Sequence, residues 1–214
     1  ILIAIAAAAF QTLRFMLQKS MSMGPLSAGG ATLARFFYGA PFACVLAVGY
    51  LSWRGVAWPD LSGVFWAYAM VGGLAQILAT LFVVLIFAER NFAVGITFKK
   101  TEVIQTAIVG FVVLGDRVSV YGFLAILIGL LGVLVLSDPP KTEARGWRRF
   151  ANRAAGLGLA SGAFFAVSAV GYRGATLEVA DGDAFLRAAV TLAVATVAQS
   201  LAMMAWLAAR EPGE

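Results

Sequence analysis

Three charged side chains stand within four positions of an otherwise apolar stretch, GITFKKTEVIQTAIVG. They are Lys99, Lys100 and Glu102. A lysine and a carboxylate at this spacing can bind an ionised solute or take up and release a proton. A charged side chain at the centre of a lipid-embedded helix costs about 2.5–3.5 kcal/mol, so charges at such a place indicate function. The structural alternative is that Lys99 and Glu102, at i and i+3, merely neutralise each other.

Polar side chains recur at helical spacing in the neighbouring apolar stretches, so that each stretch presents one polar face. Ten residues are therefore predicted to line a substrate or ion pathway: Glu102, Lys99, Lys100, Gln105, Arg14, Gln18, Gln11, Arg35, Gln76 and Thr80. The alternative for Arg14 is a place at the headgroup level, with its stem buried in the apolar region. Lys100 lies off the common face, which implies either the same behaviour or local unwinding of the helix.

Residue types exclude several other chemistries. The chain has no histidine and a single cysteine, Cys44, so a histidine-based triad, a zinc site or a disulfide cannot be built from it. We therefore expect no enzyme activity, no metal and no cofactor. The net charge is +5, but the basic residues do not cluster as a nucleic-acid-binding patch would require, and no nucleic-acid partner is expected.

The composition identifies lipid as the solvent. Hydrophobic residues make up 61% of the chain and charged residues 13%, whereas soluble domains have about 45–50% and about 25%. Seven apolar spans of transmembrane length are predicted, and they cover residues 1–18, 27–52, 62–88, 92–115, 118–137, 154–172 and 184–209. Starting the fourth span at Phe92 gives it the roughly 20 residues that a crossing needs and buries Lys99 and Glu102. The expected fold is an all-α polytopic membrane helix bundle.

An internal repeat organises the spans. AFQTLRFMLQKS, from Ala9, resembles AFFAVSAVGYRG, from Ala163, and Arg187 then follows as Arg35 does in the first copy. Residues 1–137 form a first five-helix repeat, 138–153 a polar connecting loop, and 154–214 the first two helices of a second repeat. Because five spans is an odd number, the second copy enters the membrane inverted, as in many secondary transporters. We expect three further helices of that copy to lie outside this sequence.

The end of the first repeat resembles a known family. Residues Ala107 to Ser137, AIVGFVVLGDRVSVYGFLAILIGLLGVLVLS, are similar to the end of the repeat in EamA-type transporters of the drug/metabolite transporter superfamily. There a short acidic turn precedes a fifth helix rich in Gly and Leu. The resemblance implies ten helices in two inverted repeats around a central cavity, and export of metabolites by proton exchange. KKTEVIQ replaces the apolar, proline-containing segment that many relatives have in the fourth helix.

These observations predict a secondary active transporter in the inner (plasma) membrane that exports a small polar or amphipathic metabolite. A carboxylate-bearing solute is favoured because basic groups, Arg187 among them, outnumber Glu102, which is the candidate proton-coupling carboxyl. The expected partners are this solute and the lipid bilayer, and the oligomeric state is open. The alternatives are a non-transporting accessory or structural subunit and a lipid flippase. Orientation also stays open, because the basic loops place the connecting loop in the cytoplasm whereas the resemblance places it outside.

Overall fold

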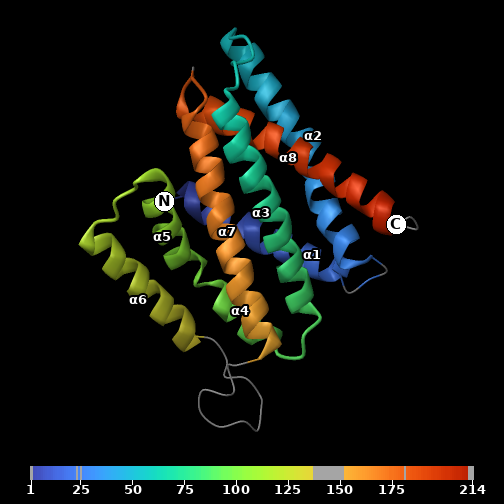
Figure 1. Cartoon of the computed structure of the whole chain (residues 1–214), viewed down its shortest axis with the longest axis vertical. Helices are drawn as coiled ribbons and strands as arrows, with labels where there is room; N and C mark the ends of the chain where they lie inside the picture. Colours follow the sequence, from blue (N-terminus) through green and yellow to red (C-terminus); the bar gives the residue numbers. More distant parts are fainter. Residues whose placement is uncertain (1, 23, 25, 137–151, 181, 212–214) are drawn as a thin grey trace.

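The fold is known from a computed structural model, which describes residues 2–22, 24, 26–136, 152–180 and 182–211. Within these residues all regular structure is helical (Figure 1). The helices are α1 (Leu2–Ser22), α2 (Ala28–Arg54), α3 (Gly63–Phe87), α4 (Phe92–Lys99), α5 (Glu102–Leu114), α6 (Val120–Leu136), α7 (Arg153–Leu177) and α8 (Ala184–Arg210). The expectation of an all-α chain is therefore confirmed.

Each predicted span coincides with a helix to within a few residues, except the fourth, which is divided into α4 and α5. Four helices, α2, α3, α7 and α8, are long and apolar enough to cross a membrane. That finding supports a membrane protein. Crossing by all seven spans and the inverted repeat remain predictions, and most of the connecting loop 138–153 lies outside the described residues.

Side-chain caps fix where the four long helices begin. Ser27, Ser62, Asn152 and Asp183 each accept a hydrogen bond from a backbone N–H in the first turn of the helix that follows. Such caps satisfy donors that a helix start leaves unpaired. Short polar side chains in these connections thus set where the four apolar helices begin.

Helices α3 and α7 lie side by side at the centre of the molecule, and α2 crosses α8 beside them (Figure 1). Glycines allow the close approach of α7 to its neighbours. A Cβ at Gly171 would lie 2.8 Å from Cα of Gly72 on α3, and one at Gly158 would strike the backbone of Gly95 on α4. Small residues at helix crossings are the usual way for membrane helices to pack closely.

One end of the bundle is held together by polar contacts between two connections, α2–α3 and α7–α8. Asp183 accepts a hydrogen bond from the Tyr50 hydroxyl (2.7 Å) and pairs with Arg54 at 3.5 Å. Ser62 donates to Glu178 at 3.2 Å. The hydrogen bond from Tyr50, together with the backbone N–H of Leu186, lowers the pKa of the Asp183 carboxyl.

The other end is defined by contacts that involve the opposite termini of the same helices. Arg153, at the start of α7, pairs with Glu89 at 3.3 Å, just after α3. Ser27, before α2, donates to Glu211, after α8, at 2.5 Å. We call the two ends the Asp183 end and the Arg153 end. The four long helices run between them in alternating directions.

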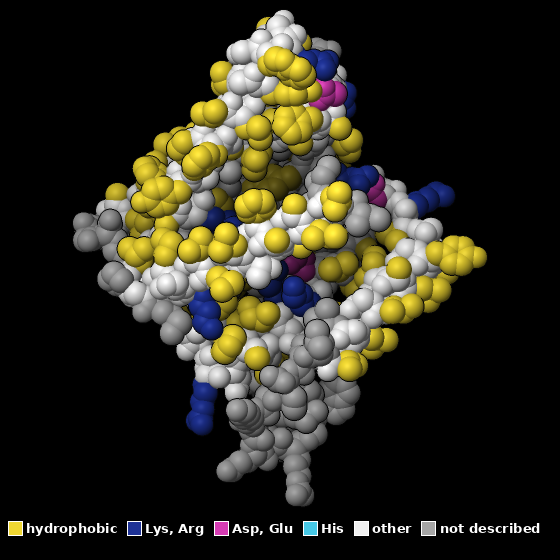
Figure 2. All heavy atoms as spheres, turned by 180° about the vertical axis from the view of Figure 1, so that it is seen from behind, with side chains coloured by type: hydrophobic (Ala, Val, Ile, Leu, Met, Phe, Trp, Pro, Cys, Tyr) yellow, Lys and Arg dark blue, Asp and Glu magenta, His cyan; other side chains and the backbone are white. Residues whose placement is uncertain are grey.

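The surface between the two ends is largely apolar. Phe42, Val45, Phe111 and Leu124 are among many large hydrophobic side chains that are exposed. On the face shown in Figure 2, hydrophobic side chains are spread widely and charged ones gather in a few places. Such a surface suits contact with lipid chains, which cover apolar side chains at no cost in hydration.

Candidate functional site

The fourth predicted span breaks at its charged residues. Helix α4 ends at Lys99 and α5 begins at Glu102. Across the break, the N–H groups of Lys100 and Thr101 donate to the carbonyls three residues earlier, those of Thr97 and Phe98. A basic residue thus closes one half-helix and an acidic residue opens the next, as the helix dipoles favour. The backbone of Lys100 and Thr101 stays in the right-handed helical region, so the junction is a tight 3₁₀ turn and not the local unwinding that the position of Lys100 allowed in the sequence.

A glycine of α7 makes room for this break. A Cβ on Gly162 would lie 3.2 Å from the carbonyl oxygen of Lys99 and 3.3 Å from the backbone nitrogen of Glu102. Both distances are tighter than ordinary van der Waals contact. The backbone on either side of the break therefore lies directly against α7.

Lys99 and Glu102 form an ion pair at the break. The Lys99 ammonium donates to Oε2 of Glu102 at 2.6 Å. Lys99 is only 6% exposed, and its Nζ lies 4.4 Å from the ring centroid of Phe165 and 5.5 Å from that of Phe15. A cation over aromatic faces gains further electrostatic attraction. The pair is thus buried on its lysine side and more open on its glutamate side.

Helix α1 adds a guanidinium and a carboxamide with unused hydrogen-bonding atoms. Arg14 lies over the ring of Phe15 at 4.7 Å, and its Nε is buried without a partner. It interacts electrostatically with both Glu102 and Lys99. One helical turn away, Gln18 is 4% exposed and neither of its amide atoms has a partner. Buried polar groups are nearly always hydrogen-bonded, so these atoms fit a place where a ligand or water binds.

Arg35 of α2 completes a partly buried cluster that we call the charge cluster: Arg14, Arg35, Lys99 and Glu102. The guanidinium of Arg35 donates to Oγ1 of Thr80 at 2.5 Å, and the electrostatic interaction between Arg35 and Arg14 is repulsive. Among the described residues, no carboxylate lies within ion-pair distance of either arginine. Arg35 stands about 10 Å along α2 from the helix start, at 1.5 Å per residue.

The remaining predicted residues are distributed unevenly. Gln105 donates to Thr101 at 3.0 Å, and its Oε1 is buried without a partner beside the cluster. Lys100 and Gln11 are exposed and do not join it. Arg187 reaches back to the carbonyls of Ala180 and Gly182 at the start of α8, far from the role that the repeat predicted for it. Arg187 lies in the first turn of α8, four residues nearer the start of its helix than Arg35 is in α2. It therefore does not reach the position that the repeat predicted.

A second polar site, which sequence analysis missed except for Gln76, lies between α3, α7 and α8. It is a cavity of about 350 Å³, which we call the threonine cavity, lined by Gln76, Tyr172, Thr176, Ala188, Thr191, Leu192, Ala195, Thr196 and Gln199. The Tyr172 hydroxyl donates to Oε1 of Gln76 at 2.7 Å, and Nε2 of Gln199 donates to the same oxygen at 3.0 Å. The spacing of Tyr172 and Thr176 by four residues on α7 is the signal that could have found it.

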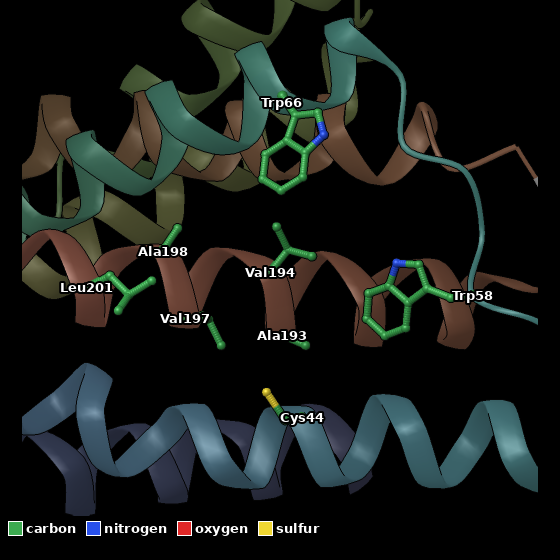
Figure 3. A pocket seen from close by; sticks show the side chains of 8 residues that line it. All are labelled: Cys44, Trp58, Trp66, Ala193, Val194, Val197, Ala198 and Leu201. Carbon is green, nitrogen blue, oxygen red and sulfur yellow. The ribbon is translucent and has the colours of Figure 1, made fainter.

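A third cavity is apolar and contributes no hydrogen-bonding chemistry. It has a volume of about 320 Å³ and lies between α2, α3 and α8. Figure 3 shows Cys44 on α2 directed toward Ala193 of α8, with Trp66 on the other side of that helix. Its lining of Trp, Val, Ala and Leu suits hydrocarbon. Among the described residues no group of acidic, cysteine or histidine side chains could hold a metal.

No protein family, curated protein or solved structure matches the chain. The resemblance to EamA-type transporters therefore remains a prediction that rests on the residues of α5 and α6.

Proposed function

We propose that this chain is a secondary active transporter, of the EamA type within the drug/metabolite transporter superfamily. It exports a small polar or amphipathic metabolite that carries a carboxylate across the inner membrane, in a proton-coupled cycle. Four helices of membrane-spanning length and a partly buried cluster of charged side chains support this proposal.

The observation that carries the proposal is the excess of positive charge in the charge cluster. Arg14, Arg35 and Lys99 are opposed only by Glu102. Two unit charges 4 Å apart interact by about 4 kcal/mol at an effective dielectric constant of 20. A carboxylate between the arginines would therefore relieve their repulsion and give Nε of Arg14 a hydrogen-bond partner. Guanidinium groups bind carboxylates through two parallel hydrogen bonds, which also fixes the orientation of the solute.

Glu102 provides the coupling to protons. When its carboxylate is ionised, it occupies the Lys99 ammonium at 2.6 Å and competes with the solute for that cation. Protonation of Glu102 releases Lys99, which can then bind the solute carboxylate. Binding of the anion and binding of the proton therefore reinforce each other, and by linkage the effect is reciprocal. Solute and proton then cross together, so export proceeds when the outward gradient of the solute exceeds the inward gradient of protons, and this cycle differs from the proton exchange that the family resemblance implies.

A non-transporting membrane subunit is the second candidate, and one observation favours it. The Lys99 ammonium already contacts a carboxylate and two aromatic rings, as a purely structural clamp between α1, α4 and α7 would require. In that case the cluster is sealed from water. Access of water to Glu102 therefore separates the two functions.

The first test is thermal unfolding of the purified protein with a panel of small carboxylates. A carboxylate that binds only the folded state at a hundred times its Kd stabilises it by about 2.7 kcal/mol. We expect Arg35→Gln and Arg35→Lys to abolish this stabilisation. Arg210→Gln, which removes an exposed cation at the end of α8, is the matched control and should retain it. Equal stabilisation of all variants would contradict the proposal.

Thiol labelling then decides between transporter and structural clamp. In a Cys44→Ala background, Glu102→Cys should react with a water-soluble maleimide, and the stabilising carboxylate should slow the reaction. Uptake of that carboxylate into proteoliposomes, with the pH dependence lost in Glu102→Gln, completes the assignment. A thiol that stays unlabelled in folded protein would establish the structural subunit instead.

A further inference from the structure

The threonine cavity is chemically unlike the charge cluster, because no charged side chain lines it. Its polar lining consists of three threonines, one tyrosine and two glutamines from α3, α7 and α8. Thr191 and Gln199 are 3% and 2% exposed. A cavity of about 350 Å³ falls within the range of about 300–1,000 Å³ that small-molecule sites occupy.

The hydrogen bonds around the cavity leave mostly acceptors for an occupant. Thr176, Thr191 and Thr196 each donate their single hydroxyl proton to a backbone carbonyl of their own helix, at 2.7–2.8 Å. Each of these oxygens keeps at least one lone pair available, since the only other contact between them is the weak one from the Thr176 hydroxyl to that of Thr191, at 3.5 Å. The Tyr172 proton is likewise committed, to Gln76.

Gln199 likewise has its hydrogen-bond donors in use and its acceptor without a partner. Its Nε2 donates to the Gly73 carbonyl and to Oε1 of Gln76, both at 3.0 Å. Both amide protons are therefore used, whereas its Oε1 is buried and has no partner. A buried acceptor without a donor costs free energy. This oxygen has almost no accessible surface, so it shows that donors are scarce around the cavity but is not itself a contact for an occupant.

Electrostatics decide which kind of donor is suitable. A protonated amine would carry a positive charge, and Tyr172 of this cavity is already within electrostatic range of Arg35 in the positively charged cluster. The positive excess of that cluster disfavours a second cation nearby. Hydroxyl groups donate hydrogen bonds without carrying charge.

We propose that the threonine cavity binds a neutral polyhydroxylated molecule, whose hydroxyl protons are accepted by Thr176, Thr191 and Thr196. This site is separate from the carboxylate site of the charge cluster. Its occupation does not depend on transport, so it is tested by equilibrium binding alone.

The experiment measures binding of radiolabelled myo-inositol to the purified full chain. We expect saturable binding, weakened at least tenfold in the double variant Thr176→Val/Thr191→Val. Thr32→Val is the matched control, because Thr32 is a buried threonine on α2 that donates to its own helix and lies outside the cavity. It should bind inositol as the unaltered protein does.

A second variant keeps the test decisive if the double variant folds poorly. Ala188→Phe fills the cavity from its exposed rim without removing a hydrogen bond, and it should also abolish inositol binding. Ala208→Phe on the same helix, outside the cavity, should not. Absence of saturable inositol binding, or equal binding by the valine and phenylalanine variants, would overturn the proposal. Binding of choline in place of inositol, lost in the same variants, would also overturn it and make the cavity a cation site.

Discussion

At the scale of single residues, the buried ion pair is the most sensitive point of the molecule. Lys99 is almost fully buried and depends on Glu102 for a counter-charge. Removing one partner of a buried pair costs about 3–5 kcal/mol, because the other charge is left uncompensated. The side chain of Glu102 is 30% exposed. We therefore expect Glu102→Gln to lower the free energy of unfolding by about 3 kcal/mol, the lower end of this range.

A double-mutant cycle measures this coupling. Lys99→Met combined with Glu102→Gln removes both charges, and replacing a buried pair by apolar or neutral groups is often neutral or stabilising. We therefore expect the double variant to unfold at a higher denaturant concentration than Glu102→Gln alone. If the two single effects simply added, Lys99 and Glu102 would be independent and the pair would be unimportant for stability.

The sequence located most of the charge cluster but not all of its geometry. Charged side chains are energetically costly in an apolar stretch, and this cost identified Lys99 and Glu102 as candidates. Helical periodicity added Arg14, Gln18 and Arg35. The same phase argument included Gln11, which is exposed, because periodicity defines a face without saying which neighbour covers it. Thr176, Thr191 and Gln199 were missed because isolated polar residues in helix-forming stretches become a site only when three helices converge.

At the scale of helices, the glycines of α7 determine how closely α3, α4 and α5 can approach it. A Cβ at Gly158 would strike the backbone of Gly95, which cannot move as a flexible side chain can. Overpacking of this kind typically costs about 1–3 kcal/mol. We expect Gly158→Ala to lower the free energy of unfolding accordingly, as measured in detergent with a chemical denaturant.

Gly156 provides the matched control for that prediction. It lies on the same helix, and a Cβ added to it would have no neighbour within 4 Å. Alanine stabilises a helix relative to glycine by up to about 1 kcal/mol, so Gly156→Ala should be neutral or stabilising. If both substitutions had the same effect, the close contact between α4 and α7 would not limit stability.

Helix boundaries were predictable to within a few residues because Ser, Asn, Asp and Gly mark them in the sequence. The division of the fourth span was less accessible. Thr101 forms no side-chain cap for α5, so no capping pattern indicates the break, and the glycine of α7 that leaves room for it is distant in sequence. A single stretch of sequence does not show which distant helix packs against it, so a break that depends on such a contact cannot be predicted from that stretch alone.

At the scale of the whole molecule, the polar contacts at the two ends of the bundle show which connections lie together, and they predict which of them share a side of the membrane. Ser62 bonds to Glu178 at the Asp183 end, and Glu89 pairs with Arg153 at the other. Helix α3 runs between them over 25 residues, about 37 Å at 1.5 Å per residue, which exceeds the roughly 30 Å of hydrocarbon in a bilayer. We therefore predict that residues 62 and 89 face opposite aqueous compartments.

Labelling of single cysteines tests this arrangement in intact cells. In a Cys44→Ala background, only one of Ser62→Cys and Glu89→Cys should react with a membrane-impermeant maleimide, and the other should react only after permeabilisation. Arg90 and Arg153 lie near the Arg153 end, and basic residues accumulate on the cytoplasmic side, so we expect Ser62→Cys to be the outward one. Labelling of Glu89→Cys from outside would instead agree with the orientation implied by the family resemblance. Labelling of both from outside would contradict the bundle itself, because α3 could not then cross the bilayer.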